Sequence, residues 1–169
     1  MKSKTLLKFS NSKVVIVICL LFGLAVGWGG GYFVGHSPST PLMEQALVTS
    51  VIDGDTIELA DGHRVRYLGI DTPEAGEPFA DEATAKNREL VEGKMVDLQR
   101  GKRNQDEYGR LLRYVYVDGI FINAELVAQG YATAYIFDPD ERYSQVIVQL
   151  EQYAKLRERG LWAMNEGGH

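Results

Sequence analysis

The chain has 169 residues and one cysteine, and 45% of its residues are hydrophobic, which fits one modest globular domain with extra segments and excludes an intramolecular disulfide. The net charge of −5 is uneven: residues 1–41 carry four lysines and no acid, whereas the remainder holds 14 basic and 23 acidic residues. Such an acidic remainder does not grip long nucleic acids by counterion release alone, so any phosphate chemistry requires a few well-placed cations and a metal ion.

A long uncharged segment, Val14–Val34, follows the four lysines. Its length is sufficient to span a bilayer core, and the preceding lysines predict a cytoplasmic N-terminus with everything after the helix exported. We therefore expect a basic cytoplasmic flank at 1–13, a transmembrane helix or uncleaved signal-anchor at 14–35, and a linker at 36–45. The domain would then sit outside the cytoplasm on a single-pass membrane anchor. The alternative is a signal peptide cleaved near Ala25-Val26-Gly27, which would secrete the domain.

A glycine stripe within this segment favours retention of the helix. Four of its glycines recur at every fourth position: Gly23, Gly27, Gly31 and Gly35. Stripes of small residues at this spacing let transmembrane helices approach closely, so the anchor would permit self-association. The plainer interpretation is a glycine-rich tail behind a signal sequence, which needs no partner.

From residue 46 onward the chain shows short β-rich runs separated by turn residues, so we expect one domain at 46–163 and a tail at 164–169. Strands are expected at Leu47–Ile52, Thr56–Leu59, Arg64–Ile70, Lys94–Gln99 and Leu111–Val117. Helices are expected at Asp81–Glu92, at Asn123–Gln129 with Asn123 as its N-cap, and at Glu141–Arg159. Five strands with helices between and after them predict an α+β, mainly β, domain built on a small Greek-key barrel.

The expected strand Arg64–Ile70 alternates in character. Val65 and Tyr67 fall on one face, and Arg64 and Arg66 fall on the other. This period of two predicts that both guanidinium groups leave the barrel wall on the same side.

Several chemistries are excluded by the residues present. The three histidines lie in the expected linker, in a turn and at the C-terminus, at His36, His63 and His169. These positions provide no zinc ligand set and no Ser-His-Asp or Cys-His arrangement. The expected domain also has no GxxxxGK phosphate loop. What remains is oxygen chemistry, with carboxylates, a hard cation and arginines.

Three short stretches carry that chemistry: Asp53-Gly54-Asp55-Thr56, Asp71-Thr72-Pro73-Glu74 and Asp106-Glu107-Tyr108-Gly109-Arg110. Taken singly, each is typical of a turn or a surface charge. Because they end or begin neighbouring strands, they could instead converge on one place.

Together these stretches contain the groups needed for displacement at phosphorus. The carboxylates of Asp55 and Asp71, with the Thr72 carbonyl, suit a calcium ion. Glu74 could orient or deprotonate the attacking water. Two arginines, Arg66 and Arg110, would present forked donors that match a phosphodiester.

The stretches Val51–Thr56, Asp71–Glu74 and Tyr108–Arg110 resemble the motifs of the staphylococcal nuclease (thermonuclease) family, in the same order and at the same intervals. The resemblance covers residues 46–163. It implies an OB-type five-stranded barrel with about three helices, and Ca²⁺-dependent hydrolysis of DNA and RNA that leaves 3′-phosphates.

The resemblance also implies a role for each matched residue. Catalytic roles fall to Arg66, Glu74 and Arg110, calcium ligation to Asp55, Asp71 and Thr72, a supporting metal shell to Asp53, and nucleotide binding to Tyr108 and Tyr135. The sequence departs from the family's type member at Glu107, which replaces a lysine, and at Phe137, which replaces a tyrosine. These departures concern affinity and substrate preference more than the chemical step.

Two further hypotheses come from other classes of protein. OB-type barrels often only bind, so the domain could be a non-catalytic nucleic-acid-binding module. It could also be a membrane-tethered interaction domain for another protein, although no residue pattern specifically favours that. The retained acids and arginines favour catalysis over both.

Overall fold

The computed structural model describes residues 43–136 and 142–166. The expected cytoplasmic flank, the expected membrane helix with its glycine stripe, Phe137 and Glu141 lie outside these residues. No helix within the described part of the chain is long and apolar enough to cross a bilayer. The division of the chain into flank, anchor, linker, domain and tail therefore stays a prediction.

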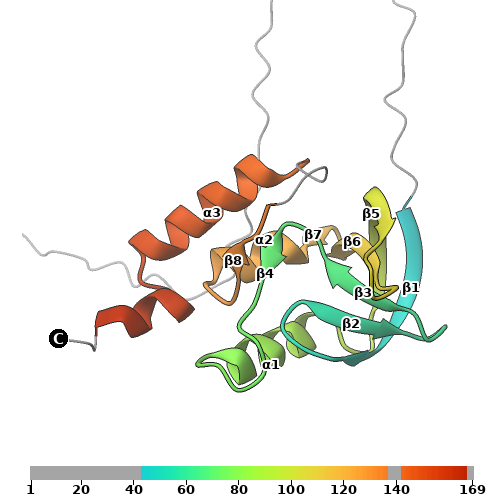
Figure 1. The fold of residues 1–169 in the computed structure, drawn as a ribbon, viewed down its shortest axis with the longest axis horizontal. Helices are drawn as coiled ribbons and strands as arrows, with labels where there is room; N and C mark the ends of the chain where they lie inside the picture. The colour runs from blue at the N-terminus through green and yellow to red at the C-terminus, as the bar shows by residue number, and fades with distance from the viewer. Residues whose placement is uncertain (1–42, 137–141, 167–169) are drawn as a thin grey trace, which may run out of the picture. The chain divides into compact units, whose positions relative to one another are not determined.

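Five strands close into a barrel (Figure 1). They are β1 (Met43–Val51), β2 (Thr56–Leu59), β3 (Arg64–Tyr67), β5 (Met95–Gln105) and β6 (Leu111–Val117). Neighbours in the order β3-β2-β1-β5-β6 are antiparallel, and a parallel pairing of β3 with β6 closes the circle. Closure removes the free sheet edges, and it places the starts of β3 and β6 beside each other. The five-stranded barrel predicted from the sequence is confirmed.

The expected strand Arg64–Ile70 is wrong in its extent. The chain leaves the barrel at Tyr67, turns through Gly69, whose φ is +79°, and starts a separate strand, β4 (Ile70–Asp71). This strand pairs with β8 (Thr133–Ala134) outside the barrel. The positive φ favours glycine, which has no Cβ to clash. The break carries Asp71 from the barrel wall to the mouth of the barrel.

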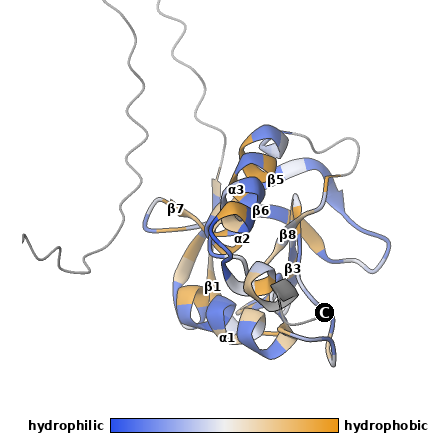
Figure 2. Cartoon of the chain, turned by 90° about the vertical axis from the view of Figure 1, so that its left-hand side faces the viewer, coloured by the Kyte–Doolittle hydropathy of each residue, from blue (hydrophilic) through white to orange (hydrophobic). Residues whose placement is uncertain are grey.

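Three α-helices and short elements complete the fold: α1 (Ala80–Val91), β7 (Ile120–Phe121), α2 (Ile122–Ala128), α3 (Ser144–Leu156) and the 3₁₀-helix η1 (Gly160–Glu166). Contacts link α1 to β1, and α2 to both β6 and α3 (Figure 1). Both α1 and α3 alternate between hydrophilic and hydrophobic colouring along their lengths in Figure 2, as expected of helices with one buried face.

The predicted N-cap role of Asn123 is wrong. The residue at the N-cap of α2 is Phe121, and Asn123 is fully buried inside the helix. Its side chain accepts a hydrogen bond from the Val115 amide at 2.9 Å and donates one to the Leu68 carbonyl at 2.8 Å. Asn123 therefore ties α2 to the barrel, because a buried amide side chain can satisfy backbone groups that would otherwise lose their partners.

The main hydrophobic core is formed by inward-facing residues of the strands together with buried residues of the three α-helices. Large fully buried side chains include Ile57, Tyr67, Leu98, Leu126 and Ile147. Each contributes roughly 1.5–3 kcal/mol on burial, so this apolar interior provides a rigid support for the polar loops at its mouth.

Candidate active site

The loop between β1 and β2 presents Asp55 in a fixed orientation. The Asp55 amide donates to the Asp53 carboxylate at 2.9 Å, which closes a local turn. A Cβ on Gly54 would lie 2.6 Å from the Thr72 hydroxyl oxygen, so only glycine lets the two segments approach this closely. This close approach brings the stretch around Asp55 against the stretch around Thr72.

Asp55 and Asp71 converge on the guanidinium of Arg66. The Nη1 of Arg66 lies 2.9 Å from the Asp55 Oδ2, and its Nη2 lies 2.6 Å from the Asp71 Oδ1. Nη1 also donates to the backbone carbonyls of Tyr67 and Ile70. The Arg66 side chain is only 14% exposed, and three hydrogen bonds together with the ion pair to Asp55 fix its orientation.

Asp55 is held to the Thr72 segment by two further contacts. The Thr72 amide donates to Asp55 Oδ2 at 3.0 Å, and the Thr72 hydroxyl lies 3.2 Å from the same oxygen. Asp53, Asp55, Arg66, Asp71 and Thr72 therefore form one cluster at the barrel mouth, as the sequence predicted.

The cluster gives the Asp55 carboxyl an unusually high pKa. Burial raises the pKa of Asp55 from 3.8 to about 7; Arg66 opposes the rise, while the neighbouring charges of Asp53 and Asp71 reinforce it. At neutral pH the Asp55 carboxyl is therefore poised between its two protonation states. The cause is a carboxylate taken out of water beside two others, with a single guanidinium to balance them.

The donor set of the cluster fits a hard cation. Two carboxylates and backbone carbonyl oxygens are the ligands that calcium accepts, and a divalent cation would relieve the crowding of negative charge around Asp55. In residues 43–136 and 142–166, no group of three or more His, Cys, Asp or Glu side chains is arranged to hold a metal ion. A bound ion would therefore need oxygen from the backbone, from water or from the substrate as well as from Asp55 and Asp71.

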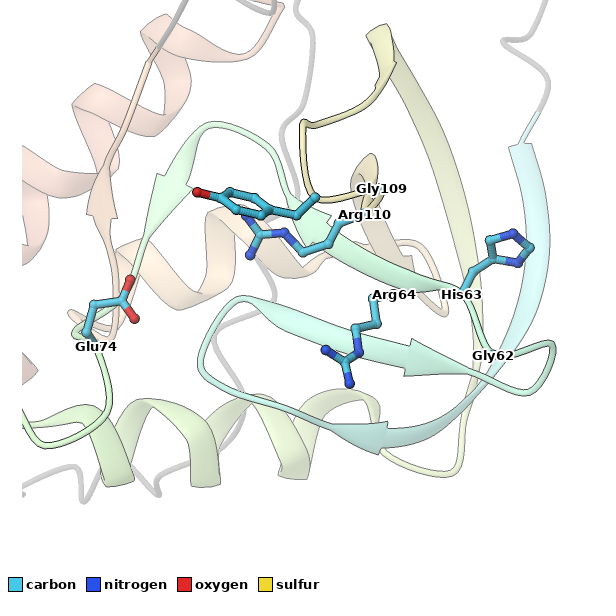
Figure 3. Close-up of a pocket in the computed structure, with 7 residues that line it drawn as sticks. Gly62, His63, Arg64, Glu74, Gly109 and Arg110 are labelled. Atoms are coloured by element: carbon cyan, nitrogen blue, oxygen red, sulfur yellow. The ribbon is translucent and has the colours of Figure 1, made fainter.

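A second group of residues lines an open groove of about 650 Å³ beside this cluster. The lining residues are Gly62, His63, Arg64, Glu74, Tyr108, Gly109 and Arg110. Figure 3 shows Glu74 at one end of the groove and His63 and Gly62 at the other, with the side chains of Arg110 and Arg64 between them. Glu74 and Arg110 thus face the same open space, although the sequence separates them by 36 positions.

Arg110 is positioned by Asp106. Its Nε lies 2.7 Å from the Asp106 Oδ2, and its backbone amide donates to Asp106 Oδ1 at 2.9 Å. The Tyr108 amide donates to the same Oδ1. Burial acts to raise the pKa of Asp106, but the hydrogen bonds from Arg110 and Tyr108 outweigh it and lower the pKa. The sequence placed Asp106 in the motif without a role, and the structure shows that it holds the loop together.

The two predicted nucleotide-binding tyrosines lie apart. Tyr108 is 77% exposed and lines the groove. The Cζ atom of the Arg110 guanidinium lies 5.5 Å from the centre of the Tyr108 ring. Tyr135 is half exposed after β8, and its amide donates to the Gly69 carbonyl. Tyr135 is not part of the groove lining, so the structure brings only Tyr108 to the groove.

The sequence did not point to Asn87, which stabilises the loop between β1 and β2 through a hydrogen bond to its backbone. This residue is fully buried on the inner face of α1; it donates to the Asp53 carbonyl and accepts from the Tyr67 hydroxyl, each at 3.0 Å. A polar residue at helical spacing from Ala80, Ala83 and Val91 was the signal that could have found it.

The barrel, the carboxylate–guanidinium cluster and the adjoining groove define an OB-type barrel with a candidate phosphodiester site at its mouth. The family model described as staphylococcal nuclease homologue matches residues 64–164. The chain belongs to this family, and the resemblance read from its motifs is confirmed.

Named relatives agree with this assignment. The chain is 38% identical over 125 residues to the SPbeta prophage-derived endonuclease YokF of Bacillus subtilis (strain 168), covering 68% of the chain and 42% of YokF. It is 35% identical over 139 residues to endonuclease YncB of the same strain, covering 76% and 66%. It is 33% identical over 128 residues to the thermonuclease of Staphylococcus intermedius, covering 70% and 76%. The match thus spans less than half of YokF and about two thirds of YncB.

Proposed function

We propose that this protein is a calcium-dependent nuclease that hydrolyses phosphodiester bonds of DNA and RNA and leaves 3′-phosphate ends. The observation that carries the proposal is the cluster in which Arg66 bridges Asp55 and Asp71, next to a groove shared by Glu74 and Arg110. The names of the relatives, endonuclease and thermonuclease, support nuclease activity as such.

Each residue would contribute through its position. Glu74 is exposed at the end of the groove and would orient or deprotonate the attacking water. Arg110, held by Asp106, would bind the phosphate and stabilise the charge that develops on its oxygens. Arg66 would add a second guanidinium, and a substrate phosphate would compete with the two carboxylates for it.

Asp55, Asp71 and the Thr72 carbonyl would hold the calcium ion, with Asp53 supporting them through its bond to the Asp55 amide. When bound, the ion would supply charge stabilisation at the phosphate and a polarised water. Burial, reinforced by the neighbouring carboxylates of Asp53 and Asp71, raises the pKa of Asp55, and a bound cation would offset both effects, which supports this assignment.

We also propose that the domain is exported and remains attached to the cell membrane through residues 14–35. This rests on the uncharged segment and its preceding lysines alone. Cell fractionation combined with mass determination of the mature N-terminus tests it. A mature chain that begins after residue 27 in the medium would instead establish the secreted form.

The activity is tested with the full chain in nonionic detergent. Release of acid-soluble nucleotides from DNA and from RNA is expected in millimolar calcium and is expected to stop when a chelator is added. Product ends that lose phosphate to a 3′-phosphatase would identify the cleaved bond. Binding of both polymers without any release would favour the non-catalytic binding module instead.

A further inference from the structure

Arg64 faces the same groove as Glu74 and Arg110 but has no part in the proposed reaction. It follows the alternation predicted from the sequence: Val65 and Tyr67 are buried in the barrel, while Arg64 is exposed and Arg66 is mostly buried on the other face. Two residues along a strand correspond to about 6.6 Å, so Arg64 lies one short step beyond the Arg66 cluster.

The neighbouring strand places a second cation beside Arg64. The parallel pairing of β3 with β6 aligns Val65 with Leu111, so Arg64 and Arg110 immediately precede the paired positions. Figure 3 shows both side chains extending into the groove, between Glu74 at one end and His63 at the other. The domain has more acidic than basic residues, but two guanidinium groups make this groove locally positive, which favours binding of a polyanion.

The ion pair that Arg64 forms with Glu58 is weak. Its Nε lies 3.7 Å from the Glu58 carboxylate, directly across from it on β2, and the two side chains are 58% and 37% exposed. Exposed pairs at this separation contribute little, so the guanidinium can be recruited by a phosphate at small cost. The groove volume of about 650 Å³ lies within the range of pockets that hold a whole drug-sized molecule, about 300–1,000 Å³, which exceeds the space of one phosphate group.

We propose that Gly62, His63 and Arg64, here called the distal groove, hold a phosphate of the polynucleotide next to the one that is cleaved. This inference rests on the proposed nuclease function and deepens it. Arg64 makes the enzyme prefer a chain of several nucleotides to a minimal substrate. It acts on binding of the longer substrate, because its ion-pair partner is Glu58 and not Asp55 or Asp71, the carboxylates that Arg66 bridges.

The decisive experiment measures binding of single-stranded oligonucleotides of two and eight nucleotides by fluorescence anisotropy, in calcium. The full chain carries Glu74→Gln so that cleavage is slow compared with the measurement. In this background Arg64→Ala is expected to raise the Kd of the eight-nucleotide strand about 3–20-fold. The lower limit corresponds to the loss of an exposed ion pair, and the upper limit to the loss of a hydrogen bond to a charged group. The two-nucleotide strand should lose at most a third as much. In Arg64→Ala, the plot of log binding constant against log salt concentration for the longer strand should become less steep by about 0.7.

Three further variants separate a phosphate site from a general charge effect. Arg64→Lys should recover most of the affinity. Glu58→Gln, which releases Arg64 from its carboxylate, should tighten binding of the longer strand. Arg88→Gln is the matched control, because Arg88 is an exposed arginine of α1 paired with Glu92 at 3.3 Å outside the groove, and it should have no effect.

Equal losses for both strand lengths in Arg64→Ala, or an equal loss in Arg88→Gln, would overturn the distal groove. The two proposals fail in distinguishable ways. A wild-type chain that binds the longer strand through Arg64 but cleaves nothing would refute the nuclease function and leave the distal groove intact. A chain that cleaves normally but binds the longer strand equally well without Arg64 would refute the distal groove and leave the nuclease function intact.

Discussion

Asp55→Asn is the substitution that tests the electrostatic account of the cluster most directly. Asparagine keeps a side-chain oxygen that can accept from the Thr72 amide and hydroxyl, and it is neutral at every pH. Arg66 would lose one carboxylate but keep Asp71 and two backbone carbonyls. The change therefore removes a buried titrating group with little change of shape.

The direction of the effect follows from the raised pKa of Asp55. A carboxyl whose pKa is higher in the folded protein than in the unfolded chain binds its proton more tightly when folded. Its contribution to stability is therefore complete below pH 3.8 and is lost as the pH rises through about 7. One pKa unit corresponds to about 1.4 kcal/mol, so the shift amounts to roughly 4 kcal/mol at most, and Asp53 and Asp71 share the titration.

The assay is urea unfolding of the full chain in nonionic detergent with a chelator, followed by tryptophan fluorescence from pH 4 to pH 8.5. The difference in free energy of unfolding between Asp55→Asn and wild type should grow in favour of the variant as the pH rises. Titrating groups that do not interact with Asp55 cancel in this difference, so only the coupled cluster of Asp53, Asp55 and Asp71 contributes to it. Added calcium at 100 times its Kd should stabilise the wild type by about 2.7 kcal/mol and the variant much less.

A difference that stays constant across this pH range would refute the raised pKa, because a carboxyl with the same pKa in the folded and the unfolded chain adds no pH dependence to the stability. Equal calcium stabilisation of both proteins would refute the assignment of Asp55 as a ligand.

Three further predictions concern single side chains. Glu74→Gln should lower turnover about 10²–10⁴-fold with little change in substrate Kd, measured by single-turnover cleavage, and near-normal turnover would remove Glu74 from the chemistry. Arg110→Ala should lower turnover by at least roughly 10²-fold through loss of a charge-stabilising donor, and kcat within tenfold of wild type in steady-state assays would contradict this. Asn123→Ala should lower the free energy of unfolding by about 1–3 kcal/mol in urea denaturation, because the Val115 amide and the Leu68 carbonyl lose their partner, whereas an unchanged midpoint would show that other groups satisfy them.

Local patterns predicted most of the secondary structure. Thr56–Leu59 and Leu111–Val117 were predicted at the bounds that the structure has, since alternating apolar residues between turn signals define short strands. The predicted strand Lys94–Gln99 begins one residue early and ends six residues early, because β5 continues to Gln105 in its hairpin with β6. That continuation depends on a pairing partner, which no local pattern shows.

The candidate site residues could be predicted because the chemistry of phosphodiester hydrolysis needs particular residue types, and the motifs that carry them are short and ordered. The supporting residues were not found by the same means. Asn87 and Asn123 are ordinary polar residues until the fold buries them against unpaired backbone groups. Asp106 is an ordinary turn residue until it accepts three hydrogen bonds from the loop that carries Arg110.

By itself, the sequence determined the class of the domain, its strand periodicity, the family to which it belongs and the candidate residues for a phosphodiester site. These depend on residue type and spacing, which are local. Only the tertiary structure decided that Arg66 bridges Asp55 and Asp71, that burial raises the pKa of Asp55, and that Arg64 shares a groove with Glu74 and Arg110. Those properties depend on distance and desolvation between segments far apart in the chain, and these are set only when the barrel closes.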